Sequence, residues 1–425
     1  MTSLIARRRF LRQSAVAATT LAAGPALLRA AGSPNSRLVV GVMGLGRGAD
    51  HIRALLQIPH IHIGYVCDVD SGRLAAAAKL VAATQAEPAK AVGDFREALA
   101  DKAVDAMTIA TPNFWHAPAT ILACAAGKHV YVEKPGSHNA REGELMVAAA
   151  RKHQRVVQMG AQRRSWPGIR EAIEKLRGGV IGRVLFARTY YTAARPSIGR
   201  GKPVPVPATL DYSLWQGPAP ERLYVDNLVP YNWHWRWHWG GGELANNGVH
   251  ALDLARWGLG VEFPRRISCT GGRYHYSDDQ ETPDTAITTF DFGSCGATFD
   301  HSSCSQRKPE DPPFVSFYGE QGSLALLGAG YKVYDPKGQV IGQGTGESGD
   351  KVHFQNFLDC VRAGSKPNAE IEEGQKSALL CHLGNIAYRV GRTLQFDAAT
   401  RKIKGDPEAE ALWGREYRSG WEPKV

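Results

Sequence analysis

Residues 37–68 read RLVVGVMGLGRGADHIRALLQIPHIHIGYVCD, and this stretch decides the fold class. A short run of β-branched residues ends at Gly44, a stretch with the apolar spacing of a helix follows, and a second β-branched run ends at Asp68. The alternation continues to residue 160, with strands expected over 103–112, 128–133 and 155–160 and helices over 73–83, 114–127 and 139–153. Strands that alternate with helices form βαβ units and a parallel sheet. We therefore predict an α/β domain over residues 36–160.

The loop between the first strand and the first helix carries a glycine pattern. Gly44-Leu45-Gly46-Arg47-Gly48-Ala49 fits G-x-G-x-x-[G/A], with Ala49 in the third small position. Small residues let the backbone approach a pyrophosphate, which the free N–H groups of the helix N-terminus bind. Asp68, about twenty residues further on, would accept hydrogen bonds from ribose hydroxyls and repel a 2′-phosphate. The pattern predicts a Rossmann domain that binds NAD rather than NADP; a flavodoxin-like turn without a nucleotide is the alternative.

After residue 160 the pattern changes to longer strands separated by turns. Strands are expected within residues 182–194, 265–276, 285–301 and 313–327, which indicates a mostly antiparallel second domain. Residues 200–225 are rich in Pro and Gly and read as an excursion loop, and 353–364 and 372–392 read as helices. We expect the second domain to span residues 161–395 and a polar, Trp-bearing tail to follow over 396–425.

The N-terminus has the pattern of a secretory signal. Residues 1–31 hold five Arg and no acidic residue, and a weakly apolar stretch ends in small residues near Ala30 and Ala31. Arg7-Arg8-Arg9-Phe10-Leu11-Arg12 resembles the twin-arginine export signal. We therefore expect the twin-arginine translocase to export the chain to the periplasm; a disordered basic tail is the alternative.

Composition excludes several other classes of protein. The formal net charge is +10, but the basic residues beyond the signal form no block, so nucleic-acid binding is not expected. The seven Cys are scattered and form no C-x-x-C pair, which argues against a zinc ribbon or a disulfide framework. A chain of 425 residues can bury a core that needs neither.

Two further turns fall at the ends of predicted parallel strands. Thr111-Pro112-Asn113 closes one strand and Glu133-Lys134-Pro135 closes the next. Open α/β sheets bind ligands at the carboxyl ends of their strands. Pro135 restricts Lys134 to an extended conformation and permits a cis bond, so the turn would fix an ammonium group at the sheet edge. A surface lysine in a tight turn is the alternative reading.

Five motifs together give the chain a family resemblance: GLGRGADH, CDVD, ATPNFWHAPA, AGKHVYVEKP and GGGELANNGVHALD. With them the chain resembles the Gfo/Idh/MocA oxidoreductases over nearly its whole mature length. The resemblance implies a Rossmann domain followed by an α/β domain with a large, open, mainly antiparallel sheet, which often forms an oligomer interface. It also implies a nicotinamide nucleotide as cofactor and a sugar or polyol as substrate. We therefore expect a homo-oligomer.

The same resemblance assigns roles to residues of this chain. Lys134 matches the family's catalytic lysine, and the residues that match Asn113 and His116 border the nicotinamide. His250 matches the histidine of D-x-G-x-H, the general base, and an imidazole can take a hydroxyl proton near neutral pH. Asn246 departs from the pattern, because it stands where the family has Asp. We expect Asn246 to position the substrate and His250 to act with Lys134; a buried histidine without chemistry is the alternative.

Residues 233–239 read WHWRWHW and allow three interpretations: a metal site, a core strand or a pocket wall. On a strand, Trp233, Trp235, Trp237 and Trp239 would share one face, and His234 and His238 would lie about 13 Å apart, too far to bind one metal. Tryptophan faces also stack on the C–H faces of sugars. We predict a strand that forms a pocket wall, followed by a helix with Asn246, His250 and Asp253 on one face. No metal is expected, and the candidate substrate residues are Arg163, Arg164, Tyr190, Tyr191, Arg195, Trp233, His234 and Trp235.

Export constrains the reaction, because little free NAD is available outside the cytoplasm. A tightly bound cofactor could be recycled by a second sugar or by an external electron carrier. It could also return its hydride to an oxidised glycoside after elimination of the substituent, which gives net hydrolysis. We predict an NAD-dependent sugar or glycoside oxidoreductase; the alternatives are an NAD-dependent glycoside hydrolase and a non-catalytic sugar-binding module.

Overall fold

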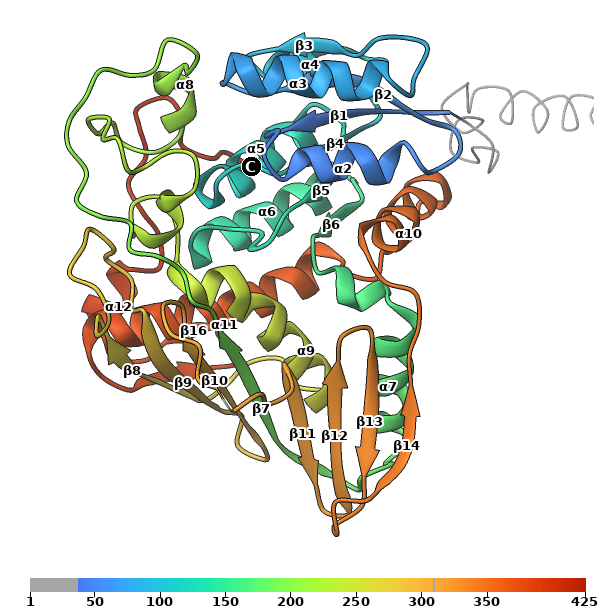
Figure 1. Cartoon of the computed structure of the whole chain (residues 1–425), viewed down its shortest axis with the longest axis vertical. Coiled ribbons are helices and arrows are strands. Elements are labelled where there is room, and N and C mark those ends of the chain that lie inside the picture. Colours follow the sequence, from blue (N-terminus) through green and yellow to red (C-terminus); the bar gives the residue numbers. More distant parts are fainter. Residues whose placement is uncertain (1–36, 309) are drawn as a thin grey trace, which may run out of the picture.

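The computed structural model describes residues 37–308 and 310–425, so the predicted export signal lies outside the described residues. The chain forms two sheets, one above the other in Figure 1, with helices between them. The strands of the first sheet are β1 (Leu38–Met43), β2 (Ile61–Cys67), β3 (Lys90–Val92), β4 (Ala106–Ile109), β5 (His129–Val132) and β6 (Val157–Met159). They run parallel in the order β3-β2-β1-β4-β5-β6, which is the order of a Rossmann domain. The predicted N-terminal fold is confirmed.

The central strands are buried on both faces, as the continuous apolar runs of a parallel sheet require. The helices of this domain are α2 (Gly48–Leu55), α3 (Ser71–Ala82), α4 (Arg96–Ala100), α5 (Asn113–Ala125) and α6 (Ala140–Lys152). Sequence analysis did not identify β3 or α4. β3 has three residues and α4 has five, so both are too short to show a clear apolar period.

The second domain is built on a ten-stranded sheet with the order β14-β13-β12-β11-β7-β10-β9-β8-β15-β16. Its strands are β7 (Val184–Thr192), β8 (Arg266–Gly272), β9 (Thr285–Asp291), β10 (Gly296–Ser302), β11 (Val315–Gly319), β12 (Gly322–Leu327), β13 (Gly330–Tyr334), β14 (Val340–Gly344), β15 (Leu394–Asp397) and β16 (Lys402–Ile403). Neighbours are antiparallel except β7 and β10, which run parallel. The prediction of a mostly antiparallel sheet is confirmed.

Helices α7 (Pro167–Arg177), α9 (Val249–Leu259) and α11 (Ile371–Val390) pack against the second sheet, and α9 and α11 lie between the two sheets in Figure 1. Helix α10 (Asp350–Ala363) instead crosses back to the Rossmann domain beside α2. There the Phe354 ring lies 4.2 Å from the ring of Tyr131, centroid to centroid. The two domains therefore share a hydrophobic core.

The strand predicted over 233–239 is wrong. Residues Asn232–Trp235 form the 3₁₀ helix η2, and a turn follows in which Trp239 N–H donates to Arg236 O at 3.0 Å. Backbone N–H groups of this segment therefore donate to carbonyls within turns and not to a neighbouring strand. The indole N–H of Trp233 donates to the carbonyl of Pro230 at 3.0 Å. The remaining short elements are α8 (Tyr212–Gln216), η1 (Gln162–Ser165), the π-helix η3 (Leu244–Gly248) and α12 (Pro407–Ala411).

All seven cysteines are free thiols, five of them buried and two partly buried. Within residues 37–308 and 310–425, no helix combines the length and apolar character that crossing a bilayer requires. In the same residues, no cluster of three or more His, Cys, Asp or Glu side chains could hold a metal ion.

Candidate active site

A cavity of about 790 Å³ lies between the two domains. We call its lining residues from Met43 to Gln162 the first wall and those from Pro207 to His250 the second wall. The first wall lies at the carboxyl ends of β1, β2, β4 and β5, where an open α/β sheet binds ligands. Of the residues predicted to bind the cofactor, the cavity is lined by Gly44, Gly46, Arg47, Asp68, Thr111, Pro112, Asn113, His116, Glu133 and Lys134.

The glycine loop leaves room for a ligand at the N-terminus of α2. Gly44 has φ +83°, and a Cβ atom there would lie 2.7 Å from the carbonyl carbon of Ala110. Gly48 packs against Val42, where a Cβ atom would lie 3.0 Å from Cγ1. The remaining two predicted residues of this loop, Leu45 and Ala49, do not line the cavity, and Leu45 is buried. The cradle fits the pyrophosphate of a dinucleotide.

Asp68 closes the loop from the end of β2. Its carboxylate accepts hydrogen bonds from the N–H groups of Leu45 at 2.6 Å and Asp70 at 2.9 Å. Burial raises the pKa of this carboxyl above its ordinary value, against the effect of the two backbone donors. The lining also contains Arg73, which sequence analysis missed although it lies only five residues after Asp68. Its Nη1 atom is 2.9 Å from the position of a Cβ atom on Gly46, so a carboxylate and a guanidinium face the same end of the cavity.

Glu133 is a buried anion behind the catalytic end of the first wall. It pairs with the His51 ring at 3.1 Å and accepts from Arg47 Nε and Gln162 Nε2 at 3.3 Å each. Burial raises the pKa of the Glu133 carboxyl, but the hydrogen bond with His51 and the charges of Arg47 and Lys134 outweigh that effect and hold it well below its usual range. Glu133 is therefore ionised and anchors this end of the wall.

Lys134 joins the two walls. The Lys134–Pro135 bond is cis, and Lys134 Nζ donates to both the main-chain oxygen and the amide Oδ1 of Asn246, at 2.8 Å each. Burial lowers the pKa of the ammonium, while the negative charges of Glu133 and Glu243 oppose the change. The amide oxygen of Asn246, which we expected to position the substrate, thus holds the lysine.

His250 lines the cavity beside Asn246. Asn246 belongs to the π-helix η3, and His250 lies in the first turn of α9. Gly248 between them lets the helix approach β10, because a Cβ atom there would lie 2.8 Å from Phe299 Cε1. Burial and the charges of Lys134 and Arg163 hold the pKa of the His250 imidazole well below its ordinary value. The ring is therefore neutral and can accept a proton.

Asp253 does not share this face, contrary to the prediction. Its carboxylate accepts Arg164 Nε at 2.9 Å through both oxygens and Ser377 Oγ at 2.6 Å, and both partners of the ion pair are buried. Asp253 lies three residues after His250 in the regular helix α9, about 60° around the helix from it, and it is held there by η1 and α11. Arg164, a candidate for the substrate pocket, is thus engaged in a structural ion pair.

Trp233 and His234 do line the cavity, together with Tyr231. The His234 ring stacks on Trp233 with 3.5 Å between centroids, and its Nδ1 lies 2.7 Å from the Tyr231 carbonyl oxygen, to which it donates. Burial lowers the pKa of His234 to about 3, so its other nitrogen is an unprotonated acceptor. An aromatic surface and a neutral imidazole therefore form this part of the second wall.

Five other residues predicted at the substrate site lie outside the lining: Arg163, Tyr190, Tyr191, Arg195 and Trp235. Strand alternation along β7 places Tyr190 beside Arg188 and Arg307, while Tyr191 accepts a hydrogen bond from Arg195 at 3.2 Å. Trp235 packs under Arg195, which pairs with the buried Glu243, and Arg163 packs over Phe314. These residues form the support behind the cavity.

Comparison with known families covers most of the chain. Residues 37–161 match the oxidoreductase family with an NAD-binding Rossmann fold, 169–325 match a Gfo/Idh/MocA C-terminal domain, and 340–423 match the C-terminal alpha/beta domain of the oxidoreductase family. The inositol 2-dehydrogenase 2 of Saccharopolyspora erythraea is 31% identical over 311 residues, 72% of this chain and 70% of the relative. The chain belongs to the Gfo/Idh/MocA oxidoreductase family, and its first domain is an NAD-binding Rossmann domain.

Other relatives match over shorter stretches. A glycosyl hydrolase family 109 protein of the same organism is 32% identical over 176 residues, 40% of this chain and 38% of the relative. The chain spans less than half the length of several curated relatives that it matches. The WlbA dehydrogenase of Bordetella pertussis, solved in complex with NADH and UDP-GlcNAcA, shares the fold with a TM-score of 0.65, 19% identity, and coverage of 85% of this chain and 99% of its own.

Proposed function

We propose that the protein is an NAD-dependent oxidoreductase that acts on a secondary hydroxyl of a sugar or glycoside. One observation carries the proposal: Lys134, Asn246 and His250 line the same cavity as the glycines of the dinucleotide loop. A bound nicotinamide supplies a hydride acceptor at such a site. The related inositol dehydrogenase supports a polyhydroxylated substrate.

His250 and Lys134 have complementary roles in this proposal. His250 accepts the hydroxyl proton, because burial and neighbouring cations keep its ring neutral. Lys134 donates a hydrogen bond to the oxygen that loses this proton and stabilises its developing negative charge. Asn246 positions Lys134 through its two oxygen atoms. The aromatic surface of Trp233 and His234 receives the apolar face of the sugar ring.

The cofactor proposed is NAD rather than NADP, retained tightly by a protein that the twin-arginine translocase exports to the periplasm. Asp68 at the ribose end supports NAD, since a carboxylate repels a 2′-phosphate. The arginine pattern at residues 7–12 supports export. A retained cofactor would be recycled at the same site by a second carbonyl compound or by an electron carrier.

Assembly into a homo-oligomer through the second sheet is also proposed. The side of that sheet away from α9 and α11 exposes large apolar side chains, including Phe186 (36% exposed), Ile287 (47%) and Tyr318 (43%). Apolar groups of this kind gather at interfaces between subunits. Light scattering of the purified protein would detect a single monomeric species if this proposal is incorrect.

The test of function starts with the purified mature protein. Mass and absorbance analysis shows whether NAD or NADH co-purifies, and a panel of sugars and glycosides is then added under anaerobic conditions. We expect the absorbance band of the reduced cofactor to rise with one class of sugar. Bound NAD that no sugar reduces would favour a non-catalytic sugar-binding module, and failure to bind NAD would refute the proposal.

A second candidate function is net glycoside hydrolysis. The observation that favours it is a second neutral imidazole, His234, in the same cavity as His250. After oxidation of a hydroxyl, His234 could remove the proton from the adjacent carbon, the substituent would leave as an alcohol, water would add, and the hydride would return to the ketone. The glycosyl hydrolase family 109 relative supports this candidate. Product analysis distinguishes the two functions, since hydrolysis releases the substituent without net reduction of NAD.

A further inference from the structure

A long irregular segment forms much of the second wall. We call residues 196–231, between β7 and η2, the strap; it contains the short helix α8, which is labelled in Figure 1. The strap contributes these lining residues: Pro207, Thr209, Leu210, Leu214, Trp215, Tyr224, Val229, Pro230 and Tyr231. Most are apolar or aromatic, and they share one cavity with Asp68 and Arg73 at the ribose end of the first wall. An adenosine bound there would therefore lie between the Rossmann domain and the strap.

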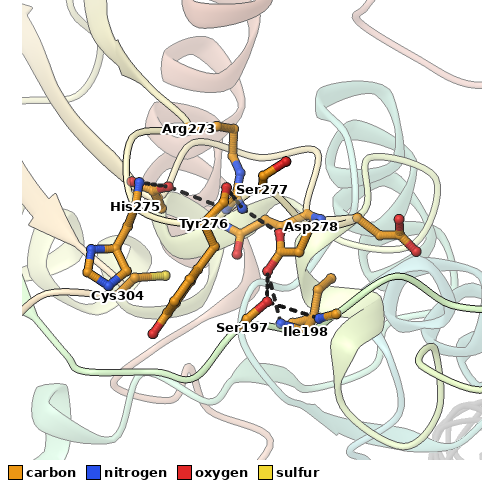
Figure 2. Close-up of polar contacts among 12 residues, drawn as sticks. Ser197, Ile198, Arg273, His275, Tyr276, Ser277, Asp278 and Cys304 are labelled. Carbon is orange, nitrogen blue, oxygen red and sulfur yellow. Dashed lines mark hydrogen bonds and ion pairs between the residues drawn. The ribbon is translucent and has the colours of Figure 1, made fainter.

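The base of the strap is held by two aspartates that precede β9. Asp278 accepts Ser197 Oγ at 2.7 Å and Ile198 N–H at 3.0 Å, and Arg273 donates to the same carboxylate, as Figure 2 shows. Asp279 accepts Gly201 N–H at 2.8 Å and Asn227 Nδ2 at 3.1 Å. These contacts fix the base to the second domain.

The middle of the strap crosses to the Rossmann domain immediately after Asp68. Ser71 N–H donates to Thr209 O and Asp211 N–H donates to Val69 O, at 2.9 Å each. Asp70 and Leu210 thereby form an antiparallel bridge. This contact joins the strap to the Rossmann domain two residues after Asp68, and Asp70 and Leu210 both line the cavity.

The end of the chain holds the strap from outside. Of the tail predicted over residues 396–425, residues 396–411 instead contribute to β15, β16 and α12. We keep the name tail for residues 412–425, which return past α8 to the Rossmann domain (Figure 1). Arg418 N–H donates to Pro218 O at 3.1 Å, its guanidinium donates to Ser213 O at 3.1 Å, and it pairs with Glu221 at 2.7 Å. The Trp421 ring packs edge-on against Trp115 with 5.2 Å between centroids.

The first residues of the tail are attached to the Rossmann domain independently of the strap. Arg415 pairs with the buried Glu142 at 2.6 Å and donates to Phe114 O at 2.7 Å. Tyr417 OH donates to the same carboxylate at 2.9 Å. The tail is therefore fixed to the Rossmann domain by Arg415 and Trp421, and it holds the strap through Arg418.

We propose that the strap forms the second wall of the adenosine site and that the tail, anchored to the Rossmann domain by Arg415 and Trp421, is a latch on it, so that NAD(H) leaves only when Arg418 releases the strap. The inference rests on the proposed binding of NAD. Removing the Arg418 guanidinium leaves every contact of the first wall in place, whereas removing Trp421 also removes a contact of Trp115, a residue of the first wall. Loss of the latch contacts lowers the energy needed to move the strap away from the cavity. The dissociation rate of the nucleotide should therefore rise more than its association rate changes.

The test measures release of NADH from the full-length mature protein. NADH is loaded, excess NAD is mixed in, and the loss of bound-NADH fluorescence is followed for the wild type, Arg418→Ala, Trp421→Ala and the double variant. We expect slow release from the wild type and release at least about tenfold faster from the double variant. Lys424→Ala, an exposed change in the same tail, should release NADH at the wild-type rate.

A second readout separates opening of the strap from general unfolding. Hydrogen exchange at the amides of Ser71 and Asp211 should accelerate in the double variant, while the thermal midpoint of the protein changes little. Equal NADH release rates in the wild type and the double variant would overturn the latch while leaving the proposed function intact. Absence of NADH binding in the wild type would overturn the proposed function itself.

Discussion

The two walls of the cavity are built in different ways. In the first wall, regular parallel strands end at one edge of a sheet, and the chain order alone brings Gly44, Asp68 and Lys134 together there. In the second wall, the strap, a 3₁₀ helix and a π-helix contain few repeating hydrogen bonds. Their position depends on individual side chains such as Asp278 and Arg418, which come from distant parts of the chain.

This difference indicates how function is divided between the walls. Regular topology fixes the cofactor loop, so its geometry tolerates many changes of sequence elsewhere. Side-chain contacts fix the substrate end and the strap, so single substitutions there can change binding without changing the fold. Variants in the two walls should therefore have different signatures.

The largest effect is expected for Lys134→Met, which keeps most of the length of the side chain and removes its ammonium group. The oxygen that loses its proton is then no longer stabilised, so turnover should fall by about 10²–10⁴-fold while NADH still binds. Steady-state rates and an NADH titration measure the two quantities. Lys102→Met, at an exposed position of the same domain, serves as the control. Turnover equal to the wild type would remove Lys134 from the reaction.

Trp233→Ala and Trp235→Ala compare a tryptophan of the second wall with a neighbouring tryptophan that lies behind it. Trp235 is 2% exposed and lies outside the cavity, so its loss should cost about 3–5 kcal/mol of unfolding free energy and leave KM unchanged. Trp233 lines the cavity, so its loss should raise KM by about tenfold. Denaturant titration measures the unfolding free energy of both variants, and sugar kinetics measure KM. A raised KM for Trp235→Ala with an unchanged KM for Trp233→Ala would contradict the geometry.

Asp68→Asn tests the ribose end of the first wall. The amide can still accept the Leu45 N–H group but carries no charge, so the preference for NAD over NADP should shrink by about tenfold. Arg73→Ala should act in the opposite direction, because it removes the guanidinium that could receive a 2′-phosphate. Dissociation constants for both nucleotides give the ratio. An unchanged ratio in both variants would show that neither side chain selects the cofactor.

The smallest effect concerns pH. Because burial, Lys134 and Arg163 lower the pKa of His250, the ring stays neutral below pH 6.5, and the acid limb of kcat/KM should lie below that value. Arg163→Ala removes one cation, so it should raise the pKa of His250 and move the acid limb upward. A pH profile of the two proteins tests the sign. A downward shift would mean that another group controls the limb.

The first wall could be predicted from the sequence, and most of the second wall could not. The Rossmann strands, the glycine loop and the turn at Lys134 could be predicted, because apolar period and glycine spacing are local signals. Trp233–Trp239 could not, because alternation of aromatic and polar residues resembles a strand even where Pro230 and the glycines impose turns. Asp253 was misplaced because its partners, Arg164 and Ser377, lie far along the chain. The strap likewise depends on distant partners such as Asp279.

The π turn at Leu244–Gly248 has a consequence for how this chain can change in length. A π turn carries one residue more than an α-helical turn, and each residue of an α-helix advances the side chains by about 100°. Deleting Ala245 would restore a regular helix and rotate the preceding glycine turn, residues 240–242, by about that angle relative to Asn246 and His250. Most surface loops tolerate gain or loss of a residue; at this position a one-residue deletion would change the register between that turn and the helix that carries His250, and turnover should fall in a protein that still folds and binds NADH.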